Sequence, residues 1–346
     1  MVDLILIACF ASGGERRVFK EFVRSYSMAF NPAKFIETAV FEIREKVGSG
    51  KAIVAMSGGV DSTVTAALMT KALGERSVSV FVDTGYMRKG EPERLKEVAK
   101  KTGMNLRFVD ARDEYYSALK GIEEPERKRK VIGEKFIRIF EKIAKEEKAG
   151  FLGQGTLAPD WIESGSGLRA TIKSHHNVGG LPKEMNLKLV EPVRELYKDE
   201  VRKVGKELGL PEAIYNRQPF PGPALAIRIM GEATKEKAEI VREACAIVEE
   251  ELEKAAKEGK MELPWQYFAV LLPVRTVGVL GDARAYGYTV AVRAVESFDG
   301  MTAKACPLPP EILGKISDRI TRVLKEHVNR VVYDVTSKPP GTIEWE

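Results

Sequence analysis

The chain has 346 residues, of which 44% are hydrophobic and 30% are charged. That length and composition exclude a wholly disordered protein and leave room for one large domain or two ordinary ones. The net charge of +5 comes from 55 basic and 50 acidic residues without a long basic run, so we expect no nucleic-acid partner.

Residues 1–27 show no regular α/β pattern. Their one apolar run, residues 4–10, has no basic residue before it and is far too short to span a membrane. The three cysteines of the chain are far apart and form no C-x-x-C pair, which argues against a disulfide framework. We interpret residues 1–27 as an N-terminal extension and expect a cytoplasmic protein without a membrane anchor.

From Pro32 onward, helical patterns alternate with short apolar runs. Continuous apolar runs are typical of strands that are buried on both faces of a parallel sheet. Strands are predicted at residues 52–56, 78–82, 106–109, 150–152 and 188–193, and helices at residues 32–47, 63–73, 92–102, 125–148 and 198–208. This alternation predicts a doubly wound α/β sheet.

Two stretches interrupt the pattern. Residues 163–188 are rich in Gly, Ser and His and too long for an ordinary connection, which is typical of a lid or of a disordered segment. The proline-rich segment 218–223 is a stiff break that neither a helix nor a central strand could contain. We place a domain boundary there, with a first domain over residues 28–221 and a second over residues 222–346.

The second domain has a different pattern. It combines helices at residues 234–257 and 310–327 with strands at residues 268–272, 276–280, 289–294 and 331–335. Such an α+β layer is small for an independent core, so we expect it to pack against the first domain or a second subunit.

The first predicted strand leads into the glycine-rich segment Ser57-Gly58-Gly59-Val60-Asp61-Ser62. A glycine-rich turn before a helix directs backbone N–H groups and the positive end of the helix at one place, which suits phosphate. A carboxylate such as that of Asp61 would repel phosphate unless Mg²⁺ lay between them. The alternative is a tight turn in which Ser57 caps the helix, but capping does not explain two glycines and three polar side chains.

This segment matches the S-G-G-x-D-S signature of the PP-loop ATP pyrophosphatases. Within that superfamily, the chain most resembles the ATP-pyrophosphatase subunits of GMP synthases, of the two-subunit archaeal-like type, from about Phe35 onward. The resemblance rests also on the segments 81–85, 128–133, 153–160, 172–177, 218–223, 272–275 and 338–346. It implies adenylation of xanthosine 5′-monophosphate (XMP), then attack by ammonia to give GMP, AMP and pyrophosphate in purine biosynthesis.

The resemblance also assigns residues to sites. Binding of ATP with Mg²⁺ falls to Ser57, Gly58, Gly59, Val60, Asp61, Ser62, Val82, Gly153 and Thr156, with Asp61 as the metal ligand. Catalysis falls to Asp61 and to the loop residues Lys173, His175, His176, Asp160 and Glu163. Binding of XMP falls to Arg129, Gln266, Lys338, Ile343 and Glu344.

Each assignment has a simpler alternative. The two loop histidines could belong to a solvated loop tip, and the turn at residues 153–156 could serve only to end a strand. Asp83, at the end of the second predicted strand, is a weaker candidate for the same sheet edge. The rigid segment 338–346 could be a docked tail that only packs.

A glutaminase needs a cysteine nucleophile with a histidine base, which this chain does not readily supply. We therefore expect ammonia from solution or from a separate glutaminase subunit. The resemblance also implies a homodimer through the second domain. The rival interpretations are another PP-loop enzyme, such as an NAD synthetase or a tRNA-modifying enzyme, and a non-catalytic nucleotide-sensing module.

Overall fold

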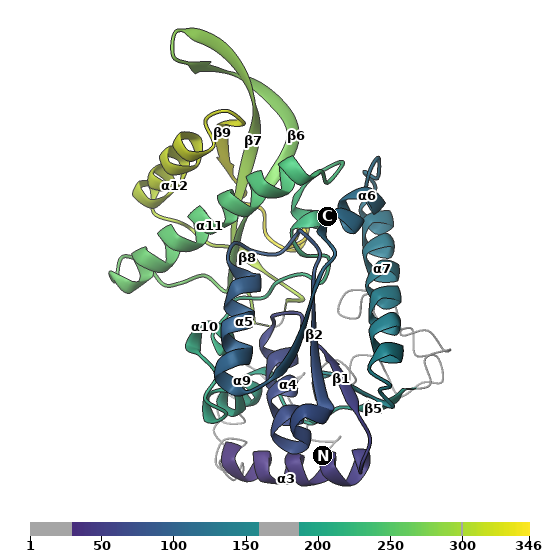
Figure 1. Ribbon diagram of the computed structural model, residues 1–346. Helices are drawn as coiled ribbons and strands as arrows, with labels where there is room; N and C mark the ends of the chain where they lie inside the picture. Colours follow the sequence, from purple (N-terminus) through teal and green to yellow (C-terminus); the bar gives the residue numbers. More distant parts are fainter. Residues whose placement is uncertain (1–29, 159–186, 299) are drawn as a thin grey trace.

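The computed structural model describes residues 30–158, 187–298 and 300–346. A parallel sheet organises the first half of the chain and a mainly antiparallel sheet the second (Figure 1). The predicted architecture, a doubly wound α/β sheet with a smaller α+β part, is confirmed. The extension predicted at residues 1–27 lies outside the described residues.

The parallel sheet has the strand order β3-β2-β1-β4-β5. Its strands are β1 (Ala52–Ala55), β2 (Ser77–Asp83), β3 (Asn105–Asp110), β4 (Phe151–Gly153) and β5 (Lys188–Val190). Every residue of β2 is buried, as expected for a strand covered on both faces. The chain order reverses beside β1, which places its carboxyl end at the switch point where open α/β sheets bind ligands.

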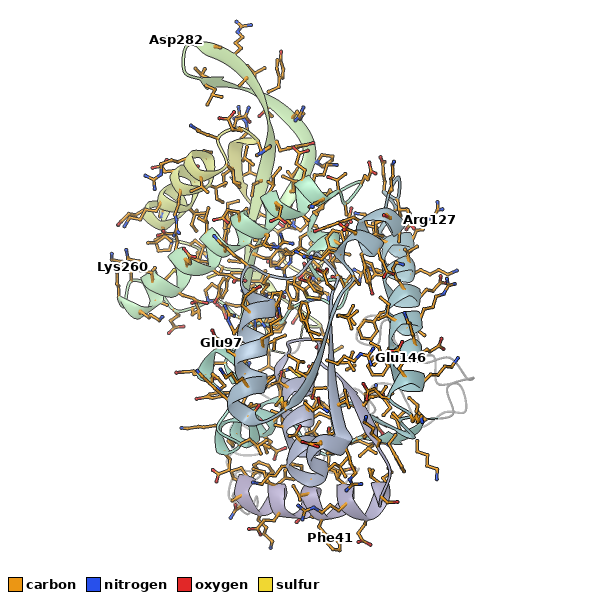
Figure 2. All side chains as sticks on the ribbon, viewed as in Figure 1. Phe41, Glu97, Arg127, Glu146, Lys260 and Asp282 are labelled. Atoms are coloured by element: carbon orange, nitrogen blue, oxygen red, sulfur yellow. The ribbon has the colours of Figure 1, made fainter. Side chains whose placement is uncertain are left out.

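Helices cover both faces of this sheet. One face packs against α3 (Pro32–Val47), α4 (Val60–Leu73), α5 (Glu91–Thr102) and α9 (Lys198–Glu207). The other packs against α6 (Arg112–Ala118) and α7 (Pro125–Glu146). Side chains alternate accordingly, because Val54 lies in the first core and Ile53 in the second. In Figure 2 the labelled Arg127 and Glu146 mark the two ends of α7.

The second sheet is built on a long hairpin of β6 (Gln266–Leu280) and β7 (Ala283–Glu296). Strand β7 also pairs with β8 (Lys304–Ala305) and, in parallel, with β9 (Val328–Tyr333). Helices α11 (Lys235–Lys257) and α12 (Pro310–Val323) pack against it. The hairpin tip extends beyond the rest of the molecule, with Asp282 at its end (Figure 2).

One hydrophobic core connects the two sheets. It joins Val80 and Phe140 of the first half to Phe268 and Ile316 of the second. The short 3-10 helix η2 (Ala224–Arg228), which is fully buried, lies at this junction, after α10 (Glu212–Tyr215) and the proline-rich break. The two halves are therefore held against each other by apolar packing as well as by the chain.

Several predicted elements differ from the structure. The strands predicted at residues 268–272 and 276–280 are one strand, β6, with a register irregularity between Leu272 and Arg275. An irregularity of this kind accommodates Pro273, which has no N–H to donate to the ladder. The strand predicted at residues 188–193 ends at Val190, and the helix predicted to reach residue 327 ends at Val323. No helix within the described residues is long and apolar enough to cross a bilayer.

Candidate active site at the edge of the parallel sheet

The glycine-rich segment forms a closed loop between β1 and α4. The hydroxyl oxygens of Ser57 and Ser62 lie 3.0 Å apart, and the Ser57 N–H donates to Ser62 Oγ at 3.2 Å. Gly58 has φ of +82°, where a side chain is strained, and a Cβ there would lie 2.4 Å from Glu91 Oε1. Only glycine fits this position.

The start of α4 is open to a ligand. Its N-cap residue is Gly59, and no side chain makes a capping hydrogen bond there. The capping alternative for Ser57 is therefore wrong: Ser57 precedes the N-cap by two residues, and its hydrogen bond from the backbone N–H of Gly59 is long, at 3.4 Å. Uncapped N–H groups at a helix N-terminus form an anion-binding site.

Asp61 lies in the first turn of α4, and only one of its two carboxylate oxygens has a partner among the described residues. Its Oδ2 lies 2.5 Å from Lys198 Nζ, at the start of α9. Its Oδ1 is buried and has no hydrogen-bond partner among the residues that the structure describes. An unpartnered carboxylate oxygen next to an uncapped helix start fits Mg²⁺, which is commonly held by one or two carboxylates together with substrate phosphates.

The segment after β4 packs directly on this loop. A Cβ at Gly155 would lie 2.9 Å from the carbonyl carbon of Asp61, and one at Gly153 would lie 2.8 Å from Val54 Cγ2. The glycines thus allow close approach of two strand ends. Thr156 donates through Oγ1 to Glu191 Oε1 at 2.6 Å. The structure confirms that residues 153–156 and the loop lie at one edge of the sheet.

The end of β2 lies at the same edge. Val82 is 2% exposed, and its side chain packs in the hydrophobic core, so only its main chain is available to a ligand. Asp83 accepts a hydrogen bond from the Gly85 N–H at 2.9 Å. Burial raises the pKa of Asp83 more than this hydrogen bond and the nearby Arg112 lower it.

The residues implied for XMP binding gather around a docked C-terminal segment. Glu344 is held by Arg228, which donates from Nε at 3.0 Å and from Nη2 at 2.8 Å, and by Gln266 Nε2 at 2.8 Å. Ile343 is buried in the shared core, and Lys338 Nζ donates to the Gly300 carbonyl at 2.8 Å. This predicted set is therefore brought to one region.

Two buried cations fix this segment. Burial alone would lower the pKa of Arg228, but attraction and hydrogen bonds from Glu344 outweigh it, so that pKa stands above its ordinary value. Lys128, fully buried on α7, bonds to Glu346 and donates to the Ile229 carbonyl at 2.7 Å. Burial lowers the pKa of Lys128. Arg129, the remaining residue of the set, donates to the main-chain oxygen of Glu346.

The predicted catalytic residues of the long loop, Lys173, His175, His176, Asp160 and Glu163, lie outside the described residues. Comparison with known proteins bears on the site as a whole. Residues 250–345 match the family model "GMP synthase C terminal domain", and residues 33–139 match the family model "NAD synthase".

Two archaeal proteins named as one subunit of a GMP synthase [glutamine-hydrolyzing] match almost from end to end. The subunit from Methanopyrus kandleri is 58% identical over 92% of this chain and 100% of its own length. The subunit of the same name from Thermococcus kodakarensis is 61% identical over 90% of this chain and 99% of its own. The chain belongs to this family of GMP synthase subunits.

Longer GMP synthases contain a segment that is similar to almost the whole of this chain. The GMP synthase [glutamine-hydrolyzing] of Lactobacillus acidophilus is 53% identical over 91% of this chain, which spans 60% of that protein. Among solved structures, an NH3-dependent NAD synthetase from Campylobacter jejuni is similar at 18% identity with a TM-score of 0.43, over 54% of this chain and 78% of that chain.

The structure adds residues that the sequence did not single out for this GMP synthase subunit. Lys198 reaches Asp61 from 137 positions later in the chain, and Arg217 donates to the Gly58 carbonyl at 3.0 Å. Arg228 holds Glu344. The sequence holds only weak indications of these roles. Lys198 is the first residue of a helix predicted after a strand of the same sheet, and Arg217 directly precedes the proline-rich break.

Proposed function

We propose that this chain catalyses the ATP-dependent amination of XMP to GMP, with AMP and pyrophosphate as the other products. The observation that carries the proposal is the uncapped start of α4 beside the unpartnered oxygen of Asp61, in a chain about 60% identical to archaeal GMP synthase subunits. The enzyme is a ligase that forms a C–N bond.

The loop is suited to hold the β- and γ-phosphates of ATP. The N–H groups at the start of α4 and the hydroxyls of Ser57 and Ser62 offer donors, and Lys198 adds a positive charge. Asp61 would hold Mg²⁺ through Oδ1, and that ion would neutralise phosphate charge. With the outer phosphates bound there, the α-phosphorus would be left open to attack by XMP.

The reaction then has two balanced steps. The C2 oxygen of XMP attacks the α-phosphorus, so that an O–P bond forms, the bond to the leaving pyrophosphate breaks and the purine ring releases its lactam N–H proton to solvent. Ammonia next attacks C2, a C–N bond forms, the C2–O bond breaks with AMP as the leaving group, and the new nitrogen releases one proton to solvent. The loop donors and Lys198 stabilise the negative charge that grows on pyrophosphate. Lys173, His175 and His176, with Asp160 and Glu163, are proposed on the resemblance alone.

The docked C-terminal segment is proposed as the XMP site. Lys338 suits the phosphate, because its half-buried ammonium bonds to a single carbonyl, that of Gly300, among the residues that the structure describes. Glu344 suits a ribose hydroxyl, since Arg228 and Gln266 hold its carboxylate in a fixed orientation. Ile343 and Arg129 complete the proposed set.

We further infer two protein partners. The archaeal relatives are named as one subunit of a glutamine-hydrolyzing enzyme, which supports a separate glutaminase subunit as the source of ammonia. A second copy of this chain is supported by the hairpin of β6 and β7, whose outer part exposes Val274, Val277, Val279 and Tyr286 by 49% to 79%. A two-stranded ribbon with apolar side chains on its surface is only marginally stable alone.

We also propose that the proline-rich segment 218–223 is the boundary between a first domain, residues 28–221, and a second domain, residues 222–346.

Product analysis tests the function. Purified protein with ATP, XMP and ammonium should give equal amounts of GMP, AMP and pyrophosphate, and glutamine should replace ammonium only when a glutaminase subunit is added. Release of ADP would contradict the pyrophosphatase mechanism. Turnover of nicotinic acid adenine dinucleotide in place of XMP would contradict the proposal and favour the NAD synthetase alternative, whose family model matches residues 33–139.

Sedimentation tests the dimer. We expect the wild-type protein to sediment as a dimer and Val279→Asp, which places a charge on the exposed ribbon, to shift it toward the monomer. A wild-type monomer at every concentration would contradict this proposal.

A further inference from the structure

A buried ion pair lies directly beneath the phosphate-binding loop. Glu91 is the first residue of α5, and Arg217 follows α10. Arg217 Nη1 lies 2.5 Å from Glu91 Oε1, and the two side chains are 9% and 1% exposed. Because each charge would be left unpaired away from water without the other, the two side chains hold each other in place.

This pair is in contact with the loop at one residue. The same Nη1 of Arg217 donates to the Gly58 carbonyl oxygen at 3.0 Å. The carboxylate of Glu91 lies against the Cα of Gly58, where a Cβ would come within 2.4 Å of Oε1. The other Glu91 oxygen accepts from the Arg88 N–H at 3.2 Å, which fixes the plane of the carboxylate.

The orientation of the Gly58 carbonyl decides where the next N–H points. In a trans peptide the C=O and the following N–H lie on opposite sides of the chain. Since Arg217 holds the Gly58 carbonyl, the Gly59 N–H is directed away from the ion pair, toward Ser57 Oγ at 3.4 Å. That long contact leaves the N–H available to a phosphate oxygen, while the repelling carbonyl is turned away from it.

Arg217 is itself anchored from the second half of the chain. Its neighbour Gln218 accepts from the Tyr267 N–H at 2.8 Å and donates to Glu249 at 3.0 Å. Arg88, which is buried, donates to the Gln218 carbonyl at 3.3 Å. The loop geometry is thus supported by the junction between the two sheets.

We propose that Glu91 and Arg217 are positioning residues that set the pyrophosphate-binding conformation of the loop through the main chain of Gly58. The inference rests on the proposed function and names a support for that site. Neither side chain needs to touch the nucleotide for this role.

Binding of magnesium pyrophosphate to the full-length chain, measured by calorimetry, tests the pair without XMP or ammonia. Arg217→Gln should weaken this binding about tenfold or more, as expected for loss of a charge-assisted hydrogen bond. The double variant Glu91→Gln with Arg217→Gln removes both charges together, so that no buried charge is left unpaired, and it should remain weak. Arg217→Lys should bind between these and the wild type.

Steady-state kinetics separates positioning from general loosening. In Arg217→Gln and in the double variant, we expect the Michaelis constant for ATP to rise together with the dissociation constant of magnesium pyrophosphate. The Michaelis constant for XMP should change by less than about twofold. Arg319→Gln, which breaks a surface ion pair between α12 and α11, is the matched control and should change neither.

A double variant or an Arg217→Lys variant that binds magnesium pyrophosphate as tightly as the wild type would overturn the inference. So would an equal rise in both Michaelis constants. Wild-type protein that binds magnesium pyrophosphate but makes no GMP would instead contradict the proposed function and leave the positioning pair intact.

Discussion

Replacing Asp61 by asparagine separates the chemistry of the loop from its stability. The side chain is 25% exposed, and its ionic partner Lys198 is 47% exposed. Ion pairs that are this open to solvent contribute about 1 kcal/mol or less to stability, because water screens them and ordering the lysine costs entropy. Asparagine keeps the shape of aspartate and its Oδ1 acceptor.

The expected loss of activity is much larger than the loss of stability. The buried Oδ1 has no partner among the described residues, so its negative charge is free to bind a metal ion that carries the phosphates. An amide oxygen has no net charge and is a far weaker ligand for Mg²⁺. We expect Asp61→Asn to lower the rate of adenylation by about 100-fold or more, a cost of about 3 kcal/mol in the transition state.

The assay measures pyrophosphate release at saturating Mg²⁺, with the melting temperature measured in parallel. The melting temperature should fall by about 2 to 4 °C at most. Asp113→Asn is the matched control, because Asp113 also lies in the first turn of a helix, α6, and is not part of the proposed site. A variant that retains more than about one third of the wild-type rate would refute the reasoning.

Three further changes test other parts of the site. Lys198→Ala should raise the Michaelis constant for ATP by about tenfold with little change in melting temperature, and an unchanged constant would contradict its role. Lys338→Met should raise the Michaelis constant for XMP far more than that for ATP. Deletion of residues 338–346 should also lower the melting temperature, because the buried cations Lys128 and Arg228 each lose their carboxylate partner. Breaking a buried ion pair in this way costs about 3–5 kcal/mol of stability. Asp83→Asn tests a pH effect: the pKa of Asp83 is raised in the folded state, so its contribution to stability is present below the unfolded pKa of about 3.9 and is lost as pH rises through the folded pKa. Urea unfolding at pH 4 and pH 7 should therefore show the wild type losing stability relative to the variant, and a relative gain would contradict the sign.

The parallel sheet could be predicted because its strands are buried on both faces. Continuous apolar runs such as residues 52–56 and 78–82 have no other simple interpretation between helices that glycines close. The long strand β6 is harder to predict, because Pro273 interrupts its apolar pattern. In the structure a register irregularity between Leu272 and Arg275 accommodates this proline. Local pattern does not report pairing, so β6 was divided into two strands.

The proposed phosphate-binding loop could be singled out from consecutive residues, but the residues that support it could not. Ser57 to Ser62 carry their chemistry within six positions, whereas Lys198 and Arg217 reach the loop from more than 130 positions away. A lysine at the start of a surface helix looks like any solvated lysine. Likewise, Glu344 could be assigned a role by resemblance, while its buried partner Arg228 depends on tertiary packing.

The contact between Lys128 and Glu346 joins residues 218 positions apart. Contacts at such separation require most of the intervening chain to be ordered first, because closing a long loop costs entropy before any bond repays it. The proposed XMP site around this contact is therefore expected to assemble late during folding. A chain folded in its first half alone would carry the residues of the proposed triphosphate site, but it would lack both the contacts with Tyr267 and Glu249 that anchor the segment next to Arg217 and the site for a second substrate.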